Sequence, residues 1–246
     1  MKKYFIFIIS VLFLACSNNL PEPPDEINCE EWDYPVKPGM EEWGLVTKTY
    51  EERVKVCQIP ENILYCVSTE RLLDLCLQNP LFFNAWAYDY FDRGLDHVFR
   101  VFNGLPELYQ REDMVHYLIK RYQEKIQSLD STENKEDPLR GRFDFAMSIQ
   151  KLDAMFSRVE QQESLKEILQ NLVIGYERYK EIDMPTFGRD MFKFNYFSRA
   201  HVIIKICEPC LEEIPYGKNN TVFLPTNVIW EPAYDIVDQL SYQLIK

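Results

Sequence analysis

The sequence predicts an all-α fold, an irregular α/α superhelix or α-solenoid of about eight or nine antiparallel helices. Apolar residues recur at steps of three and four along most of the 246-residue chain, as they do on the buried face of a helix. Only eight residues are glycine and 14% are aromatic, a composition that favours packed helices over turn-rich β-sandwiches. Because most connections are short, consecutive helices are expected to be antiparallel neighbours.

The first residues of the chain have the features of a bacterial export signal. Two lysines precede an apolar run over residues 4–15, which is too short to span a bilayer because a spanning helix needs roughly 20 residues. The end of this run and Cys16 read Phe-Leu-Ala-Cys and resemble a lipobox, in which leucine is usual at the first position. We therefore expect residues 1–15 to be a cleaved lipoprotein signal peptide and Cys16 to carry a membrane-anchoring lipid.

Residues 16–38 are predicted to be the lipidated cysteine followed by a proline-rich tether. Pro21, Pro23 and Pro24 favour extended polyproline geometry, and the neighbouring charges keep the segment solvated. The protein is therefore expected at the cell envelope, lipid-anchored in the outer membrane on its periplasmic or its surface face.

Residues 39–246 are predicted to form a single helical domain. Apolar stripes at helical spacing cover residues 40–57, 68–76, 95–102, 114–129, 145–159, 165–179, 191–204 and 233–244. A break at Asn79 and Pro80 precedes a short aromatic segment. Residues 130–142 and 211–232 are predicted to be loops because they collect proline, glycine and polar residues.

Six cysteines besides the lipidated one allow 15 disulfide connectivities. Cys57, Cys66 and Cys76 lie in helical apolar patterns, so we expect mostly unpaired thiols that pack as small hydrophobic residues. Cys207 and Cys210 have the spacing of a redox pair, but they follow a predicted helix, whose C-terminal dipole raises the pKa of a thiol. We expect structural thiols or a local disulfide at this pair.

The chain has a formal net charge of −12 and no cluster of lysine and arginine. A balance of this size argues against nucleic acid and other polyanions as partners. Basic peptides, cations and neutral sugars remain compatible with it.

One segment concentrates aromatic rings and carboxylates. The candidate ligand-binding side chains are Trp86, Tyr88, Asp89, Tyr90, Asp92, Asp96 and His97. Aromatic faces beside carboxylates suit a sugar or a cationic peptide. The same residues also fit a helix junction, in which aromatic side chains wedge helices together and aspartates cap helices or face water.

No metal site, cofactor site or catalytic residue is predicted. His97, His116 and His201 form no zinc-binding motif, and the chain has no nucleophile elbow, P-loop or dinucleotide fingerprint. His201 lies on an apolar stripe and is expected to be packed and hydrogen-bonded, whereas His97 and His116 are expected to be solvated. The acidic run of Glu160, Glu163 and Glu167 is expected to be a solvated helix face.

Several strings of the sequence resemble a family of uncharacterised lipoproteins of the Bacteroidetes type. They are YPVKPGMEEW at residues 34–43, IPE at 59–61, STERL at 68–72, NPLFF at 79–83 and FNG at 102–104. The resemblance covers the end of the tether and the first third of the body. It implies a small all-helical envelope protein, and it implies no catalytic residue, cofactor or substrate.

Export in that group of bacteria gives one short string a further meaning. Asp130, Ser131 and Thr132 are similar to the three-residue O-glycosylation signal of these organisms, with Ser131 as the acceptor. The string lies in the longest predicted internal loop. Loops are rich in aspartate and serine, so the same string also arises by chance.

Three functions fit these features. The first is a non-enzymatic envelope lipoprotein whose helical body binds a protein, a peptide or a glycan. The second is a glycan-processing hydrolase that uses paired carboxylates, such as Asp89 and Asp92, as acid and base. The third is an immunity or inhibitor protein, for which an acidic helical domain suits a basic toxin. A shallow aromatic groove would favour the first, a deep cleft with close carboxylates the second and an acidic face the third.

Overall fold

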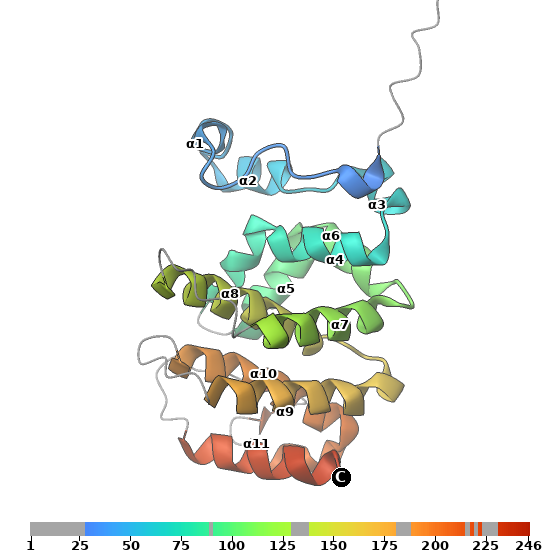
Figure 1. Cartoon of the computed structure of the whole chain (residues 1–246), viewed down its shortest axis with the longest axis vertical. Helices are drawn as coiled ribbons and strands as arrows, with labels where there is room; N and C mark the ends of the chain where they lie inside the picture. Colours follow the sequence, from blue (N-terminus) through green and yellow to red (C-terminus); the bar gives the residue numbers. More distant parts are fainter. Residues whose placement is uncertain are drawn as a thin grey trace, which may run out of the picture.

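The computed structural model describes residues 28–88, 91–128, 138–180, 188–214, 217–218, 221–222 and 231–246. These residues form a stack of helical layers that follows the chain from its N-terminal to its C-terminal end (Figure 1). The prediction of an all-α fold is confirmed, with eleven α-helices in the described residues where about eight or nine were expected.

The elements follow one another in short segments at first and in longer helices later. In chain order they are η1 (Cys29–Glu31), α1 (Glu41–Val46), α2 (Tyr50–Val56), α3 (Glu61–Cys66), α4 (Thr69–Gln78), η2 (Pro80–Ala87), α5 (Phe91–Val101), α6 (Gly104–Tyr109), α7 (Met114–Gln127), α8 (Pro138–Phe156), η4 (Gln162–Ser164), α9 (Leu165–Lys180), α10 (Gly188–Ile206), η5 (Glu208–Glu212), β1 (Gly217–Lys218), β2 (Thr221–Val222) and α11 (Glu231–Leu244). The η elements are short 3-10 helices, and β1 and β2 form a two-residue antiparallel pair.

The first layer contains α1, α2 and α3, and the next contains α4, α5 and α6 (Figure 1). Below them α7 lies beside α8, then α9 beside α10, and α11 closes the stack. The core runs through all of these layers as one cluster of buried apolar side chains. Each layer thus buries apolar faces against the layers before and after it, as in a solenoid.

Residues 28–38 belong to the folded body. A disulfide joins Cys29 to Cys66 at the end of α3, and Tyr34 is only 3% exposed. The Tyr34 hydroxyl donates a hydrogen bond of 3.0 Å to the carbonyl oxygen of Leu75 on α4. The prediction that the tether extends to residue 38 is therefore wrong, because a disulfide and one buried ring fix a segment that has no helical period.

The cysteines are more often paired than expected. Cys66 forms a disulfide with Cys29, and Cys207 and Cys210 form the local disulfide considered for them. Cys57 and Cys76 are free and buried, as expected. Burial raises the pKa of the Cys57 thiol to about 11, which keeps it protonated and unreactive at neutral pH. The expectation of mostly free thiols is thus wrong for Cys66.

Two helix boundaries differ from the predicted ones. The stripe over residues 40–57 forms two helices, because Thr49 starts α2 with a capping box in which it and Glu52 exchange side-chain-to-backbone hydrogen bonds. The helix α8 begins at Pro138, inside the loop predicted for residues 130–142. Proline suits this first helical position because its missing N–H would have no partner there.

A buried arginine joins the last helices of the stack. Arg199 on α10 is fully buried, and its Nη1 donates to the Asp238 carboxylate on α11 at 2.6 Å. Its guanidinium also lies 4.1 Å from the ring centroid of Tyr176 on α9. A buried cation needs such partners, so this contact fixes α11 against α9 and α10.

Candidate functional site

The structure brings together part of the segment that the sequence marked as a ligand site. The His97 ring on α5 packs between two tyrosines, with centroid distances of 5.6 Å to Tyr50 and 5.4 Å to Tyr88. The Tyr50 hydroxyl also forms a hydrogen bond with His97 Nε2. Tyr50 comes from α2, so this aromatic group connects the first two layers of the stack.

Other residues of that predicted site lie outside the part of the chain that the structure describes. Asp89 and Tyr90 fall between the described residues, and the side chains of Trp86 and Asp92 are not described. Ser131 and Cys16 also fall outside the described residues. Their expected roles as ligand-binding, glycosylated and lipidated residues therefore stay predictions.

A shallow hollow of about 490 Å³ opens beside the aromatic group, and we call it the aromatic hollow. The described residues that line it are Tyr88, Arg93, Asp96, Phe99 and Arg100. The Asp96 carboxylate forms an ion pair of 2.9 Å with Arg158, which lies in the turn that follows α8. The Arg158 guanidinium in turn lies 5.9 Å from the ring centroid of Phe99. The one described carboxylate of this hollow is thus bound to a cation.

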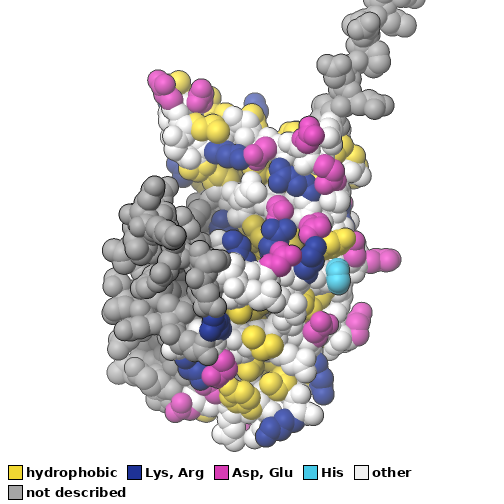
Figure 2. Space-filling view, in the orientation of Figure 1, with side chains coloured by type: hydrophobic (Ala, Val, Ile, Leu, Met, Phe, Trp, Pro, Cys, Tyr) yellow, Lys and Arg dark blue, Asp and Glu magenta, His cyan; other side chains and the backbone are white. Residues whose placement is uncertain are grey.

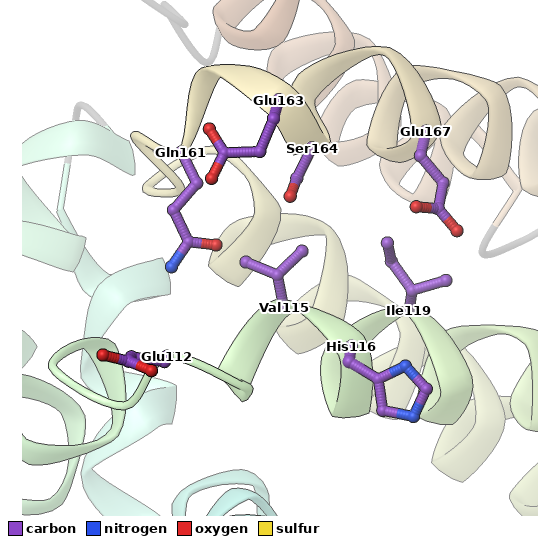
Figure 3. A pocket seen from close by; sticks show the side chains of 8 residues that line it. All are labelled: Glu112, Val115, His116, Ile119, Gln161, Glu163, Ser164 and Glu167. Carbon is purple, nitrogen blue, oxygen red and sulfur yellow. The ribbon is translucent and has the colours of Figure 1, made fainter.

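A second hollow lies between α7 and the segment that leads into α9, and we call it the acidic pocket (Figure 3). Its volume is about 470 Å³, and it is lined by Glu112, Val115, His116, Ile119, Gln161, Glu163, Ser164 and Glu167. Val115 and Ile119 are 4% and 6% exposed and point from α7 toward the opposite wall. Ser164 and Glu167 point back toward α7. The pocket therefore has an apolar floor and a polar, acidic rim.

The carboxylates of the acidic pocket have no cationic partner in the described part of the chain. Glu112, Glu163 and Glu167 form no ion pair with any described residue, and all three are exposed. Neighbouring carboxylates on the body behave differently, because Glu70 binds Lys120 at 2.7 Å and Asp74 binds Arg121 at 2.8 Å. Three unpaired negative charges around one hollow produce a local field that attracts a cation.

The helices position these carboxylates through ordinary packing. Met114 and Leu118 of α7 face the core, which turns Val115 and Ile119 toward α9 at the helix surface. A 3-10 turn then leads into α9, and Leu165, which follows it, is fully buried. This buried side chain anchors the start of α9, so the carboxylates on either side of it are held above α7.

No group of three His, Cys, Asp or Glu side chains is placed to hold a metal ion within the described residues. His201, expected to be packed, is 8% exposed and its Nδ1 lies 3.1 Å from the Phe197 carbonyl oxygen. Burial lowers the pKa of His201 to about 3, so this ring is neutral at physiological pH. The interpretation of His201 as a core histidine is confirmed.

The acidic pocket was missed at the level of sequence. Glu163 and Glu167 were interpreted as a solvated helix face and His116 as a solvated side chain, and each is indeed exposed. These side chains form a pocket because α7 packs against α9 in space, although the whole of α8 separates the two helices in the sequence. No spacing within either segment signals that approach.

Comparison with family models, with curated proteins and with solved structures gives no match, so the candidate site rests on the residues of this chain. Among the described residues, no helix has both the length and the apolar character that crossing a membrane requires.

Proposed function

We propose that this chain is a non-enzymatic lipoprotein of the outer membrane, anchored through Cys16, whose body binds a basic segment of a partner protein. The observation that carries the proposal is the acidic pocket, in which three carboxylates that form no ion pair with a described residue surround an apolar floor. The lipobox-like end of the signal and the resemblance to envelope lipoproteins support the location.

The chemistry of the pocket fits a lysine or arginine side chain. Such a side chain has an aliphatic stem, which would lie on Val115 and Ile119, and a charged head, which would reach Glu163 or Glu167. A volume of about 470 Å³ lies within the usual range of ligand sites, roughly 300 to 1,000 Å³. The net charge of −12 would add long-range attraction for a basic partner.

The other two functions have different support. A hydrolase needs accessible, paired carboxylates. Asp96 forms an ion pair with Arg158. Asp153 is fully buried, and burial raises its pKa. Nothing in the described residues therefore favours that mechanism. An immunity protein against a basic toxin is a special case of the binding proposed, with the toxin as the basic partner.

A glycan at the aromatic hollow is a second candidate ligand. Tyr88 is 38% exposed at its rim, and its ring lies tilted against His97, which leaves ring surface available for a sugar face. A hollow lined in part by arginines would suit an acidic sugar. This ligand would occupy a different face from the basic segment.

The first prediction concerns affinity for basic peptides. Wild-type protein and an E112Q/E163Q/E167Q variant are titrated with a lysine- and arginine-rich peptide in calorimetry at low and at physiological salt. We expect the variant to bind roughly 10- to 100-fold more weakly, since each lost charge-assisted contact at an exposed site contributes about 1 kcal/mol or less. The wild-type affinity should fall as salt screens the carboxylates.

The control variant E41Q/E42Q/E51Q removes the same charge from exposed positions on α1 and α2. It should retain affinity to within about threefold, which separates the pocket from the overall charge. Equal losses in the two variants would mean that only net charge attracts the peptide, and the proposal for the pocket would then be wrong.

A further inference from the structure

Large apolar side chains are unusually exposed in the first layer of the stack. The described residues include eight exposed large hydrophobic side chains, and four of these are Met40, Leu45, Val46 and Tyr65. Leu45 is 63% exposed and Tyr65 is 77% exposed. Figure 2 shows hydrophobic side chains among acidic ones at this end of the molecule. Clusters of exposed apolar side chains mark surfaces that are covered in the working state.

The helix α1 is the least covered element of this layer. None of its six residues is buried, and it packs mainly against α2. A helix this short is not stable on its propensity alone and ordinarily depends on packing. Its exposed apolar side chains therefore lack the contact that usually holds such a helix.

This end of the body is also the end at which the anchor arrives. The described chain begins at η1 in the same layer, and the disulfide from η1 reaches Cys66, the residue next to Tyr65. Eleven residues lie between Cys16 and Asn28, and fully extended this segment spans at most about 40 Å. A lipid on Cys16 would therefore keep the first layer close to the bilayer.

We propose that the first layer is a membrane-contact surface, on which Met40, Leu45, Val46 and Tyr65 enter the interface of a lipid bilayer. The inference rests on the proposed anchoring at Cys16. Leucine and methionine supply apolar area, and an exposed tyrosine suits the boundary between headgroups and acyl chains. Glu41 and Glu42 on α1 would be repelled by anionic headgroups, so the surface fits zwitterionic lipid.

The contact would also orient the body. The acidic pocket lies on α7 and α9, in the later layers of the stack (Figure 1). With the first layer on the membrane, these layers point away from the bilayer. The pocket then faces the aqueous space in which a basic partner is found.

The test measures how the unlipidated protein partitions onto vesicles. A chain that starts at Ser17, which has neither the apolar signal nor the lipidated cysteine, is mixed with phosphatidylcholine vesicles and with vesicles that contain a third phosphatidylglycerol, and bound protein is measured by flotation. We expect partition onto phosphatidylcholine, weaker partition onto the anionic vesicles, and at least a tenfold loss on phosphatidylcholine with L45E or Y65E. The control I174E changes a 58% exposed side chain on α9 and should stay within twofold.

Three results would overturn the proposal. One is no partition of the chain that starts at Ser17, and another is an equal loss in I174E and L45E. The third is an L45E-sensitive dimer in sedimentation without vesicles, which would make a second copy the occupant. Circular dichroism of L45E and a milder M40S variant checks that the fold is intact. The mass of the N-terminal peptide of the wild-type chain separately reports lipidation, so a failure of anchoring is distinguished from a failure of this surface.

Discussion

A Gly94→Ala variant is expected to lose about 3 kcal/mol of unfolding free energy, or more. A Cβ added at Gly94 would lie 2.1 Å from the carbonyl oxygen of Ala85 and 2.7 Å from its Cα. Both are backbone atoms of η2, so no side chain can turn aside and α5 would have to move away. Overpacking of this kind costs about 1–3 kcal/mol and sometimes more. Thermal unfolding should show a midpoint lower by roughly 6–12 °C for a chain of this size.

The same variant should also disturb the aromatic hollow, because α5 carries His97 and Phe99.

Gly44→Ala is the matched control, since nothing lies within 4 Å of a Cβ added there. Gly44 is within α1, where alanine is the better helix former by about 1 kcal/mol, so its midpoint should stay the same or rise. Equal destabilisation by the two substitutions would contradict the close packing of α5 on η2.

The protein is expected to lose stability as the pH falls from 6.5 toward 3, through His201. Burial holds the pKa of His201 at about 3 in the folded chain, whereas the unfolded value is about 6.5. The stability that this neutral ring contributes is fully present above pH 6.5 and is lost as the pH falls, because the unfolded chain then binds the proton first. The full difference corresponds to roughly 4–5 kcal/mol at 1.36 kcal/mol per pH unit.

Urea unfolding of the wild type and of a His201→Gln variant at pH 6.5 and pH 5 measures this contribution. Glutamine does not titrate and can still donate to the Phe197 carbonyl oxygen. Between these pH values the wild type should lose about 2 kcal/mol more than the variant. Asp153 has the opposite effect on the pH dependence of stability, because burial raises its pKa. It is present in both proteins, so its contribution cancels in the comparison. Identical pH dependence of the two proteins would contradict a buried, neutral His201.

The helical fold was largely readable from the sequence because each long helix has its own apolar period. The stripes over residues 114–129, 165–179 and 191–204 coincide closely with α7, α9 and α10. Residues 28–38 could not be predicted in the same way, since the contacts of Tyr34 and Cys29 are made to partners about 40 positions away. Such pairings depend on tertiary approach, which local periodicity does not contain.

In the candidate site, too, features local in the sequence could be predicted and contacts between distant segments could not. Tyr88, Asp96 and His97 are close in sequence, and the rings of Tyr88 and His97 are in contact in the structure. Arg158, which forms an ion pair with Asp96, lies in the turn after α8, and no sequence spacing connects the two residues. The acidic pocket combines α7 with the start of α9 in the same way. Sequence therefore located a local aromatic cluster and missed the pocket on which the proposed function depends.

The most direct test of basic-segment binding is photo-crosslinking from inside the acidic pocket. A photoreactive amino acid replaces Ser164, which lines the pocket, and in a matched protein it replaces Ile174 on α9 outside it. Both are crosslinked in intact cells, and the attached peptides are identified by mass spectrometry. We expect one lysine- or arginine-rich peptide of a partner at position 164, absent at position 174 and reduced by E163Q/E167Q. Crosslinks at position 164 to acidic or uncharged segments, or the same set at both positions, would contradict it.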